Sequence, residues 1–260
     1  MPFRQVASLR VLQFDILDQT GLVQAVFTRH GGVSPAPWQS LNVGGTVGDE
    51  RARVLENRRR CFSAAERPMD SIFDVWQVHS AKVIVADEPR GESPPVQADA
   101  LITDNPRVTL FMRFADCVPI LLYDPRRPAI GLVHAGWLGT VRKTAAAAVR
   151  AMAETFGSRA EDLRAAIGPS IGPDHYPIGE DVASQAREAF GGQAVKHLRE
   201  VNGRVHFDLW SANRAVLEEV GVSSIEVAGL CTACHLDDWY SHRAEAGKTG
   251  RFGGLIALRS

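Results

Sequence analysis

The chain has 260 residues, of which 45% are hydrophobic and 23% charged, a composition that suits a large folded domain and excludes a disordered chain. Lys and Arg number 29 against 30 Asp and Glu, so no basic face is indicated and nucleic acid is not expected as a partner. No apolar run has membrane-spanning length, and residues 1–17 mix charges with apolar residues, unlike a secretory signal. We therefore expect a cytoplasmic protein with no membrane partner.

Short apolar runs bounded by turn residues predict strands along the whole chain. Several of these runs follow one another through short turns, as they do on both sides of Ala115–Cys117. In chain order the predicted strands cover 22–28, 74–78, 82–86, 108–114, 118–123, 129–133, 163–167, 225–228 and 252–258.

Apolar residues at helical spacing predict four helices between these strands. Asp208 can cap the last of them, and Gly157 can end the second. The segment 88–97 is rich in Pro, Gly and Glu and is expected to form a surface loop. Strands that are adjacent through short turns favour a mixed sheet, or two sheets, with helices outside. The predicted helices cover 50–64, 139–156, 179–190 and 209–220.

His79, Cys117 and His134 share one local character, because each follows or interrupts an apolar strand and so projects from a strand end. Catalytic zinc commonly keeps three protein ligands and one open position. Two imidazoles and one thiolate suit zinc and also copper. Their separations along the chain are long, so spacing alone leaves open the alternative of a buried cysteine and two histidines that bond to backbone carbonyls.

The four cysteines are interpreted as thiols or metal ligands, because disulfides are rare in a reducing compartment. Cys231 and Cys234 form a Cys-x-x-Cys pair, which is able to hold structural zinc when two further ligands complete it. His235 and His242 are the candidates for those further ligands.

A set of short motifs occurs in order along nearly the whole chain. Together these motifs resemble the YfiH-type family, once labelled laccase-domain or polyphenol oxidase proteins and now described as purine nucleoside phosphorylases. The motifs are Thr28–Ser34, Leu41–Gly44, Val47–Asp49, Gln77–Ser80, Ala98–Thr103, Ala115–Pro119, His134–Trp137, Gly168–Gly172, Cys231–Thr232 and Thr249–Arg251.

The resemblance implies an α+β fold, a single domain over residues 1–260 in which mixed β-sheets pack together with outer helices (α/β/β/α), related to toxin deamidases. It implies zinc, with copper as the alternative, on His79, Cys117 and His134. The implied activities are phosphorolysis of adenosine, inosine, guanosine and methylthioadenosine, together with deamination of adenosine. The expected partners are thus a small purine nucleoside and phosphate, and the oligomeric state is left open.

Further roles are assigned to residues near these motifs. A helix N-terminus favours an anion, so Gly136 and Thr140 are expected to bind phosphate. Arg29 and Arg243 are candidate phosphate contacts, because guanidinium binds phosphate through two parallel hydrogen bonds. The alternatives are that Arg29 braces the turn that follows it and that Arg243 is a surface cation.

Asp116 is expected to orient a ligand or act as a base, with capping of a backbone turn as the alternative. The resemblance places Cys231 at the wall of the catalytic pocket. Three positions depart from the family pattern. Leu138 stands where a basic residue is usual, and His175 stands where a cysteine is frequent. His242 lies in the segment 240–244, Tyr-Ser-His-Arg-Ala, where an aromatic-Ser-Tyr-Arg-Arg sequence is usual.

Other functions remain open at this stage. A metal-free cysteine hydrolase or deamidase would use Cys117 as nucleophile and His134 as base. A copper-dependent polyphenol oxidase would need several copper centres, to which one three-ligand site is a poor match. An enzyme that edits peptidoglycan precursors and a scaffold without turnover are the remaining alternatives.

Overall fold

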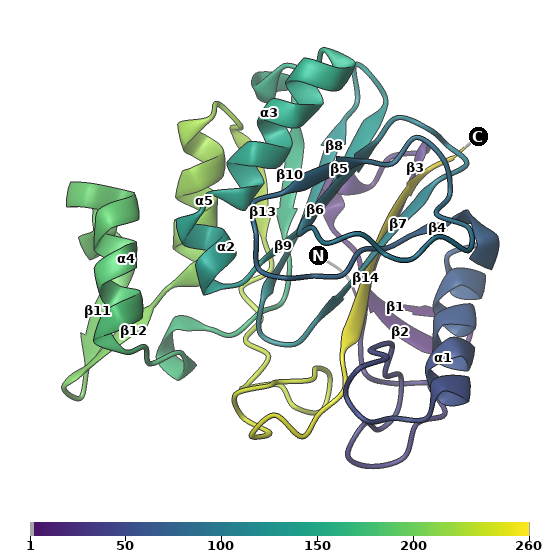
Figure 1. The fold of residues 1–260 in the computed structure, drawn as a ribbon, viewed down its shortest axis with the longest axis horizontal. Coiled ribbons are helices and arrows are strands. Elements are labelled where there is room, and N and C mark those ends of the chain that lie inside the picture. Colours follow the sequence, from purple (N-terminus) through teal and green to yellow (C-terminus); the bar gives the residue numbers. More distant parts are fainter. Residues whose placement is uncertain (1–2, 260) are drawn as a thin grey trace.

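Residues 3–259, which the computed structural model describes, form two six-stranded sheets that stack face to face and carry helices on their outer faces (Figure 1). In spatial order the first sheet consists of β1 (Phe3–Val6), β2 (Leu9–Leu12), β3 (Leu22–Phe27), β14 (Phe252–Leu258), β7 (Thr109–Phe114) and β4 (Ile72–Phe73). The second consists of β13 (Ser224–Val227), β10 (Arg164–Ile167), β8 (Val118–Asp124), β9 (Ala129–Ala135), β6 (Ala100–Thr103) and β5 (Val83–Val85).

Helices cover the two outer faces of this pair of sheets. Helix α1 (Arg51–Ala64) packs on the first sheet, and α2 (Trp137–Val141), α3 (Thr144–Phe156) and α5 (Leu209–Glu219) pack on the second (Figure 1). Further out lie α4 (Glu180–Phe190) and a small hairpin of β11 (Leu198–Val201) and β12 (Arg204–Phe207). The α/β/β/α arrangement of mixed sheets with outer helices is therefore confirmed.

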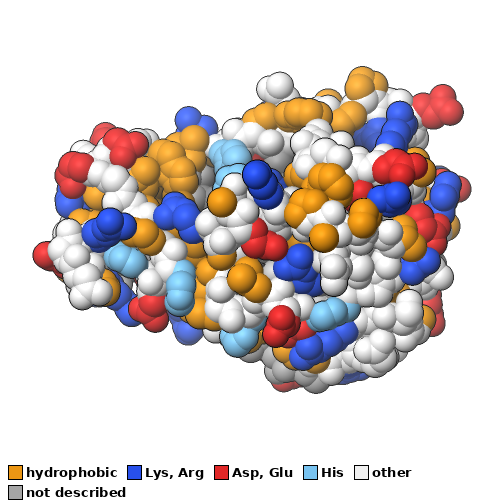
Figure 2. Space-filling view, turned by 90° about the horizontal axis from the view of Figure 1, so that it is seen from below, with side chains coloured by type: hydrophobic (Ala, Val, Ile, Leu, Met, Phe, Trp, Pro, Cys, Tyr) orange, Lys and Arg blue, Asp and Glu red, His pale blue; other side chains and the backbone are white. Residues whose placement is uncertain are grey.

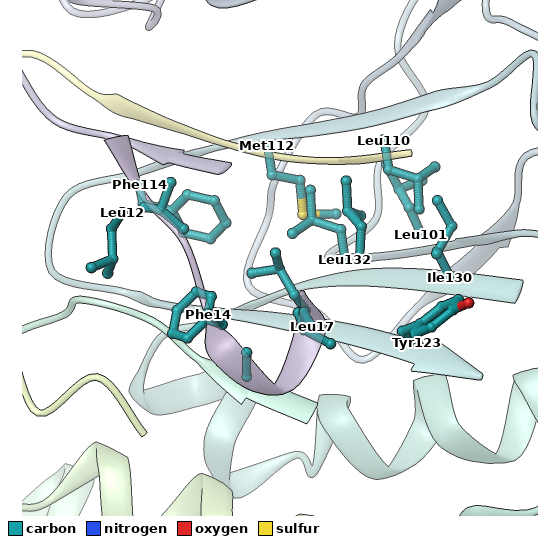
Figure 3. Close-up of a cluster of buried hydrophobic side chains, with 14 of the residues drawn as sticks. Leu12, Phe14, Leu17, Leu101, Leu110, Met112, Phe114, Tyr123, Ile130 and Leu132 are labelled. Atoms are coloured by element: carbon teal, nitrogen blue, oxygen red, sulfur yellow. The ribbon is translucent and has the colours of Figure 1, made fainter. Parts of the chain in front are cut away.

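The main core lies between the two sheets (Figure 3). Strand β7 illustrates how the period-two pattern builds it, since Leu110, Met112 and Phe114 point into this core. Phe111 points the opposite way and meets Phe62 of α1, with ring centroids 5.6 Å apart. Both faces of the sheet are covered, so its central strands are apolar on both sides and read as continuous apolar runs.

Most of the predicted elements are observed with boundaries shifted by one or two residues. The cap of α5 is confirmed, because the Asp208 carboxylate accepts a hydrogen bond from the Ser211 N–H at 3.0 Å. Strands β1, β2, β4, β6, β11 and β12 were not among the predicted strands.

The predicted strand over 74–78 is wrong, because the side chain of Gln77 makes the hydrogen bonds to β7 that a strand backbone would make. At the edge of β7 the Gln77 side chain donates to the Arg113 carbonyl and accepts from the Arg113 N–H, at 2.8 and 3.1 Å. These are the backbone groups that a neighbouring strand would bond. Within this segment only Trp76 makes a strand-like bridge, to Gln97.

The single helix predicted over 139–156 is also wrong, because α2 and α3 are separated there. Lys143 adopts a left-handed conformation with φ of 55°, which interrupts the helix. The Thr144 hydroxyl bonds the carbonyls of Gly139 and Ser80, both at 2.9 Å. The hydrogen bond to Ser80 thus connects the start of α3 to the segment that contains His79.

Charges on the surface are mixed. On the face shown in Figure 2, basic, acidic and histidine side chains are interspersed with apolar ones, in keeping with the near balance of charges in the sequence. No helix within residues 3–259 combines the length and the hydropathy that crossing a bilayer requires.

His197 provides a prediction about stability and pH. Its ring is 4% exposed, its Nδ1 bonds the Ser211 hydroxyl at 2.9 Å, and burial lowers its pKa below the ordinary 6.5. The unfolded chain therefore binds a proton more readily than the folded protein, so the unfolding free energy falls as pH drops below 6.5, by at most about 1.4 kcal/mol per pH unit.

Urea unfolding in EDTA at pH 7.5 and 5.5 should show a smaller loss of unfolding free energy for His197→Asn than for the wild type. The exposed-site variant His235→Asn should behave as the wild type does, and equal losses in all three proteins would contradict the prediction.

Candidate metal centre

Three candidate ligands meet at one end of the second sheet. The ligand atoms of His79, Cys117 and His134 all lie within 4.8 Å of one another. Cys117 Sγ is 3.8 Å from His79 Nε2, and the rings of the two histidines have centroids 5.1 Å apart. The three side chains that the sequence singled out thus converge in space.

Sheet register accounts for two of the three positions. In the antiparallel pair β8–β9, Val118 lies opposite Ala135 and Pro119 opposite His134. Cys117, directly before β8, therefore reaches the end of β9 where His134 lies. His79 comes from the irregular segment after β4 and has a left-handed φ of 58°. A non-glycine residue with positive φ is strained, so tertiary contacts must hold it in place.

Asp99 supplies those contacts and links the two histidines. Its Oδ2 accepts hydrogen bonds from the N–H groups of Val78 and Ser80 and from the Ser80 hydroxyl. Its Oδ1 bonds His134 Nδ1 at 2.9 Å. Burial opposes ionisation of Asp99, but hydrogen bonds from His134 and Ser80 outweigh it and lower the pKa to about 2.

The ionised Asp99 determines the tautomer of His134. A carboxylate only accepts, so His134 Nδ1 carries the proton and Nε2 keeps its lone pair. Burial lowers the pKa of His134, which favours the neutral imidazole that metals require. A carboxylate behind a ligating histidine is a recurrent feature of metal sites.

The donor set fits a zinc ion. Zn–S and Zn–N bonds of ~2.3 and ~2.0–2.1 Å in tetrahedral geometry place sulfur and nitrogen ~3.6 Å apart, and the observed separation of Cys117 Sγ from His79 Nε2 is 3.8 Å. Burial and the neighbouring Asp116 raise the pKa of the Cys117 thiol to about 12, so a cation is the natural partner for its thiolate form. The same donors also suit copper.

Gly136 leads to a sharp prediction about this centre. A Cβ atom at this position would lie 2.7 Å from Cys117 Sγ and 3.2 Å from His79 Cδ2. We expect Gly136→Ala to displace the ligands and weaken metal binding at least about tenfold, as misplaced metal ligands do, while the far-UV circular dichroism stays unchanged. Competition with a chromophoric chelator measures the affinity. Gly192→Ala is the control, because a Cβ there meets nothing within 4 Å; equal affinities in the two variants would refute the prediction.

The candidate ligands form part of the wall of a cavity of about 680 Å³. Five arginines and two aspartates line it, so the cavity is positively charged and favours an anion. Three aromatic residues, Trp76, Trp137 and Tyr176, also line it and offer flat apolar surface. The lining arginines are Arg58, Arg90, Arg113, Arg243 and Arg251.

Asp74 neutralises only part of this positive charge. Its carboxylate, 4% exposed, pairs with Arg58, Arg90 and Arg113 at 2.7 to 3.5 Å. Burial lowers the pKa of Arg113 to about 10, which leaves it charged at neutral pH. One carboxylate shared by three guanidinium groups leaves a net positive wall.

Arg251 has no carboxylate partner among the described residues. Its Nη1 donates to the carbonyls of Thr249 and Gly250, and its backbone N–H bonds Asn42. The remaining guanidinium donors are available to a ligand beside Cys117 and Asp116, whose charges act on the pKa of Arg251.

Asp116 and Arg243 are also at the cavity. The Asp116 carboxylate accepts from the Thr232 hydroxyl at 2.6 Å and from the Arg243 N–H at 2.7 Å. Asp116 therefore joins the turn of Cys117 to the segments that carry Thr232 and Arg243. The Arg243 guanidinium lies over the Tyr176 ring, 5.0 Å from its centroid, and bonds the Pro177 carbonyl.

Four of the predicted substrate contacts, Arg29, Gly136, Thr140 and Cys231, lie outside the cavity lining. The Arg29 guanidinium donates to the carbonyls of Gln39 and Leu236 and pairs with Glu245, so it connects loops. Thr140 is fully buried and bonds Gly136 and Asn213.

Cys231 is the last of these four residues. Its sulfur accepts a hydrogen bond from the Gly172 N–H, and its backbone forms a strand-like bridge with Ser170. Conversely, no role was assigned from sequence to Asp99, Arg113 or Arg251. Features of the sequence could have pointed to them. Arg113 is a charged residue inside an apolar strand, Asp99 lies in the motif 98–103, and Arg251 lies in the motif 249–251.

The fold and this centre define an α/β/β/α protein with a His–Cys–His cluster at a basic cavity. Residues 23–259 match the family model described as multi-copper polyphenol oxidoreductase laccase. The chain belongs to this family, that of the YfiH-type proteins.

Relatives support the same placement. The chain is 42% identical over 234 residues to a purine nucleoside phosphorylase of Deinococcus radiodurans, covering 90% of this chain and 88% of the relative. It is 37% identical over 249 residues to purine nucleoside phosphorylase YlmD of Geobacillus stearothermophilus, covering 92% of this chain and 91% of the relative. The crystal structure of the hypothetical protein YfiH of Bacillus licheniformis superposes with a TM-score of 0.92 at 32% identity, over 99% of both chains.

Proposed function

We propose that this protein is a cytoplasmic, zinc-dependent purine nucleoside phosphorylase that also deaminates adenosine. The observation that carries the proposal is the meeting of His79, Cys117 and His134 at the wall of a basic, aromatic-lined cavity. Curated relatives at 42% and 37% identity are named purine nucleoside phosphorylases, which supports the substrate class.

Phosphorolysis requires the cavity to hold both the phosphate and the purine ring. In phosphorolysis a phosphate oxygen bonds C1′ of the ribose, the bond from C1′ to the purine nitrogen breaks, and the base leaves with a proton. Arg251 and Arg243 are suited to hold the phosphate, because guanidinium groups bind it bidentately. Trp76, Trp137 and Tyr176 are suited to hold the purine ring. Adenosine, inosine, guanosine and methylthioadenosine are the proposed substrates.

The metal would be held by His79, Cys117 and His134. When bound, zinc supplies a Lewis acid for the charge that develops in the reaction. The chain itself contributes Asp99, which fixes the ring of His134, and Asp116, which fixes the backbone of Arg243. Asp116 already accepts two hydrogen bonds and is proposed as a positioning residue that orients the Cys117 turn.

The direct test is to incubate the zinc-loaded protein with adenosine, with and without phosphate, and to separate the products. We expect adenine and ribose 1-phosphate only with phosphate, and inosine in both reactions. Metal content of protein purified from its own cells decides between zinc and copper. Absence of both adenine and inosine would refute the proposed function.

A further inference from the structure

A second group of metal-ligating side chains lies around the Cys-x-x-Cys turn. His175 ends the short 3₁₀ segment Pro173–His175 and meets both Cys231 and Cys234. Its Nδ1 lies 3.5 Å from Cys234 Sγ and 3.8 Å from Cys231 Sγ. All three ligand atoms are within 4.8 Å of one another. His235 and His242, the partners considered from sequence, are not in this group.

The distances fit a tetrahedral metal. Zn–S bonds of ~2.3 Å and Zn–N bonds of ~2.0–2.1 Å place sulfur ~3.6 Å from nitrogen and the two sulfurs ~3.8 Å apart. The observed sulfur–nitrogen distances of 3.5 and 3.8 Å bracket the first value. Both cysteines are free thiols, so both sulfurs are available as ligands.

The backbone holds this arrangement in place. Cys231 is 7% exposed and pairs in a strand-like bridge with Ser170. Its sulfur accepts a hydrogen bond from the Gly172 N–H at 3.1 Å, and such donors favour the thiolate that binds metal. A Cβ on Gly172 would lie 3.0 Å from Cys231 Cβ, so the close approach depends on glycine.

We propose that His175, Cys231 and Cys234 bind a second metal ion, a thiophilic d¹⁰ cation, Zn²⁺ or Cu⁺. Two thiolates and one imidazole select such ions over Mg²⁺ or Ca²⁺. His175 and Cys234 are exposed, so an ion has access to the cluster from solvent.

The location gives this site a structural role next to the cavity. Tyr176, which follows His175, lines the cavity. Thr232, which follows Cys231, donates to the Asp116 carboxylate. An ion that joins these two segments would fix the cavity wall on the side of Tyr176 and Asp116. Its ligands are different residues from those of the His79–Cys117–His134 centre.

Metal stoichiometry tests this site independently of the proposed enzymatic activity. The full-length protein is reduced, stripped of metal, reloaded with Zn²⁺ under anaerobic conditions, freed of excess ion and analysed by mass spectrometry. We expect two zinc ions per wild-type chain and one in Cys234→Ser and in His175→Ala. The matched control His235→Ala, beside Cys234 and outside the cluster, should keep two. Parallel loading with Cu⁺, followed by competition with Zn²⁺, shows which of the two ions the site prefers.

Two further measurements complete the test. Co²⁺-substituted wild type should show more thiolate-to-cobalt charge-transfer absorption than Cys234→Ser, and Zn²⁺ should raise the Tm of wild type more than that of Cys234→Ser. The proposal is overturned if Cys234→Ser retains two zinc ions, or if the wild type binds one while both cysteines of the turn stay reactive to a thiol reagent. If the wild type binds two zinc ions and turns over no nucleoside, the result counts against the proposed function and leaves the second metal site supported.

Discussion

Cys117→Ala is expected to lose one metal ion per chain and at least about 10³-fold in kcat/KM for phosphorolysis of adenosine. The thiolate is the anionic member of the proposed ligand set, and its removal leaves two neutral imidazoles, which hold zinc weakly. A 10³-fold loss corresponds to ~4 kcal/mol of transition-state stabilisation, which is within the range that a bound metal supplies. Deamination of adenosine should fall in parallel. Product formation by chromatography and metal content by mass spectrometry provide the two readouts.

The control for Cys117→Ala is His235→Ala, which alters an exposed side chain outside the cavity and should retain both metal and activity. His134→Ala should behave as Cys117→Ala does, because it removes a second ligand of the same ion. If both variants keep full turnover, the assignment of the centre is wrong. If activity is lost while the wild type is active without metal, the cysteine hydrolase chemistry of Cys117 with His134 gains support over the zinc enzyme.

The structure gives a physical reason to favour the metal over that alternative. Burial and Asp116 raise the pKa of Cys117 to about 12, so without a cation the thiol stays protonated at neutral pH. His134 Nδ1 is engaged by Asp99, and burial lowers the pKa of His134, which makes it a weak base. A nucleophilic cysteine instead needs surroundings that lower its pKa.

Arg251→Gln is expected to raise the KM for phosphate by about 10- to 100-fold, because a charge-assisted hydrogen bond to a charged group is worth ~1.5–3 kcal/mol. Deamination uses water and no phosphate, so its rate should change less than about threefold, a difference within ~0.7 kcal/mol. This contrast separates loss of the phosphate contact from general damage to the centre. Steady-state kinetics with phosphate varied at saturating adenosine provide the measurement.

Arg150→Gln is the matched control for Arg251→Gln, because Arg150 is an exposed arginine on α3. It should leave both reactions unchanged. Arg29→Gln should leave the KM for phosphate unchanged as well and act on stability, since Arg29 ties loops together through carbonyls and Glu245. Equal losses of phosphorolysis and deamination in Arg251→Gln would show that Arg251 supports the centre and does not hold phosphate.

Sequence reasoning succeeded where the signal was local. The apolar runs of β7, β8, β9 and β14 and the pattern of α5 with its Asp208 cap were predicted correctly, because periodicity and capping depend on neighbouring residues. It failed over 74–78, where the Gln77 side chain takes the place of a strand. It also failed at Lys143, where a left-handed residue divides a helical pattern.

The sequence by itself determined the kinds of donor available and the ordered motifs that place the chain in its family, since these depend only on residue identity and order. Only the tertiary structure decided which donors meet. His79 and Cys117 are 38 residues apart, and His134 is 35 from Asp99, so their contact depends on strand register and loop crossing. The same reason explains why His175 lies beside the Cys-x-x-Cys turn and why Arg251, instead of Arg29, reaches the cavity. Local patterns encode elements, whereas contacts between distant elements arise from how the sheets and loops pack.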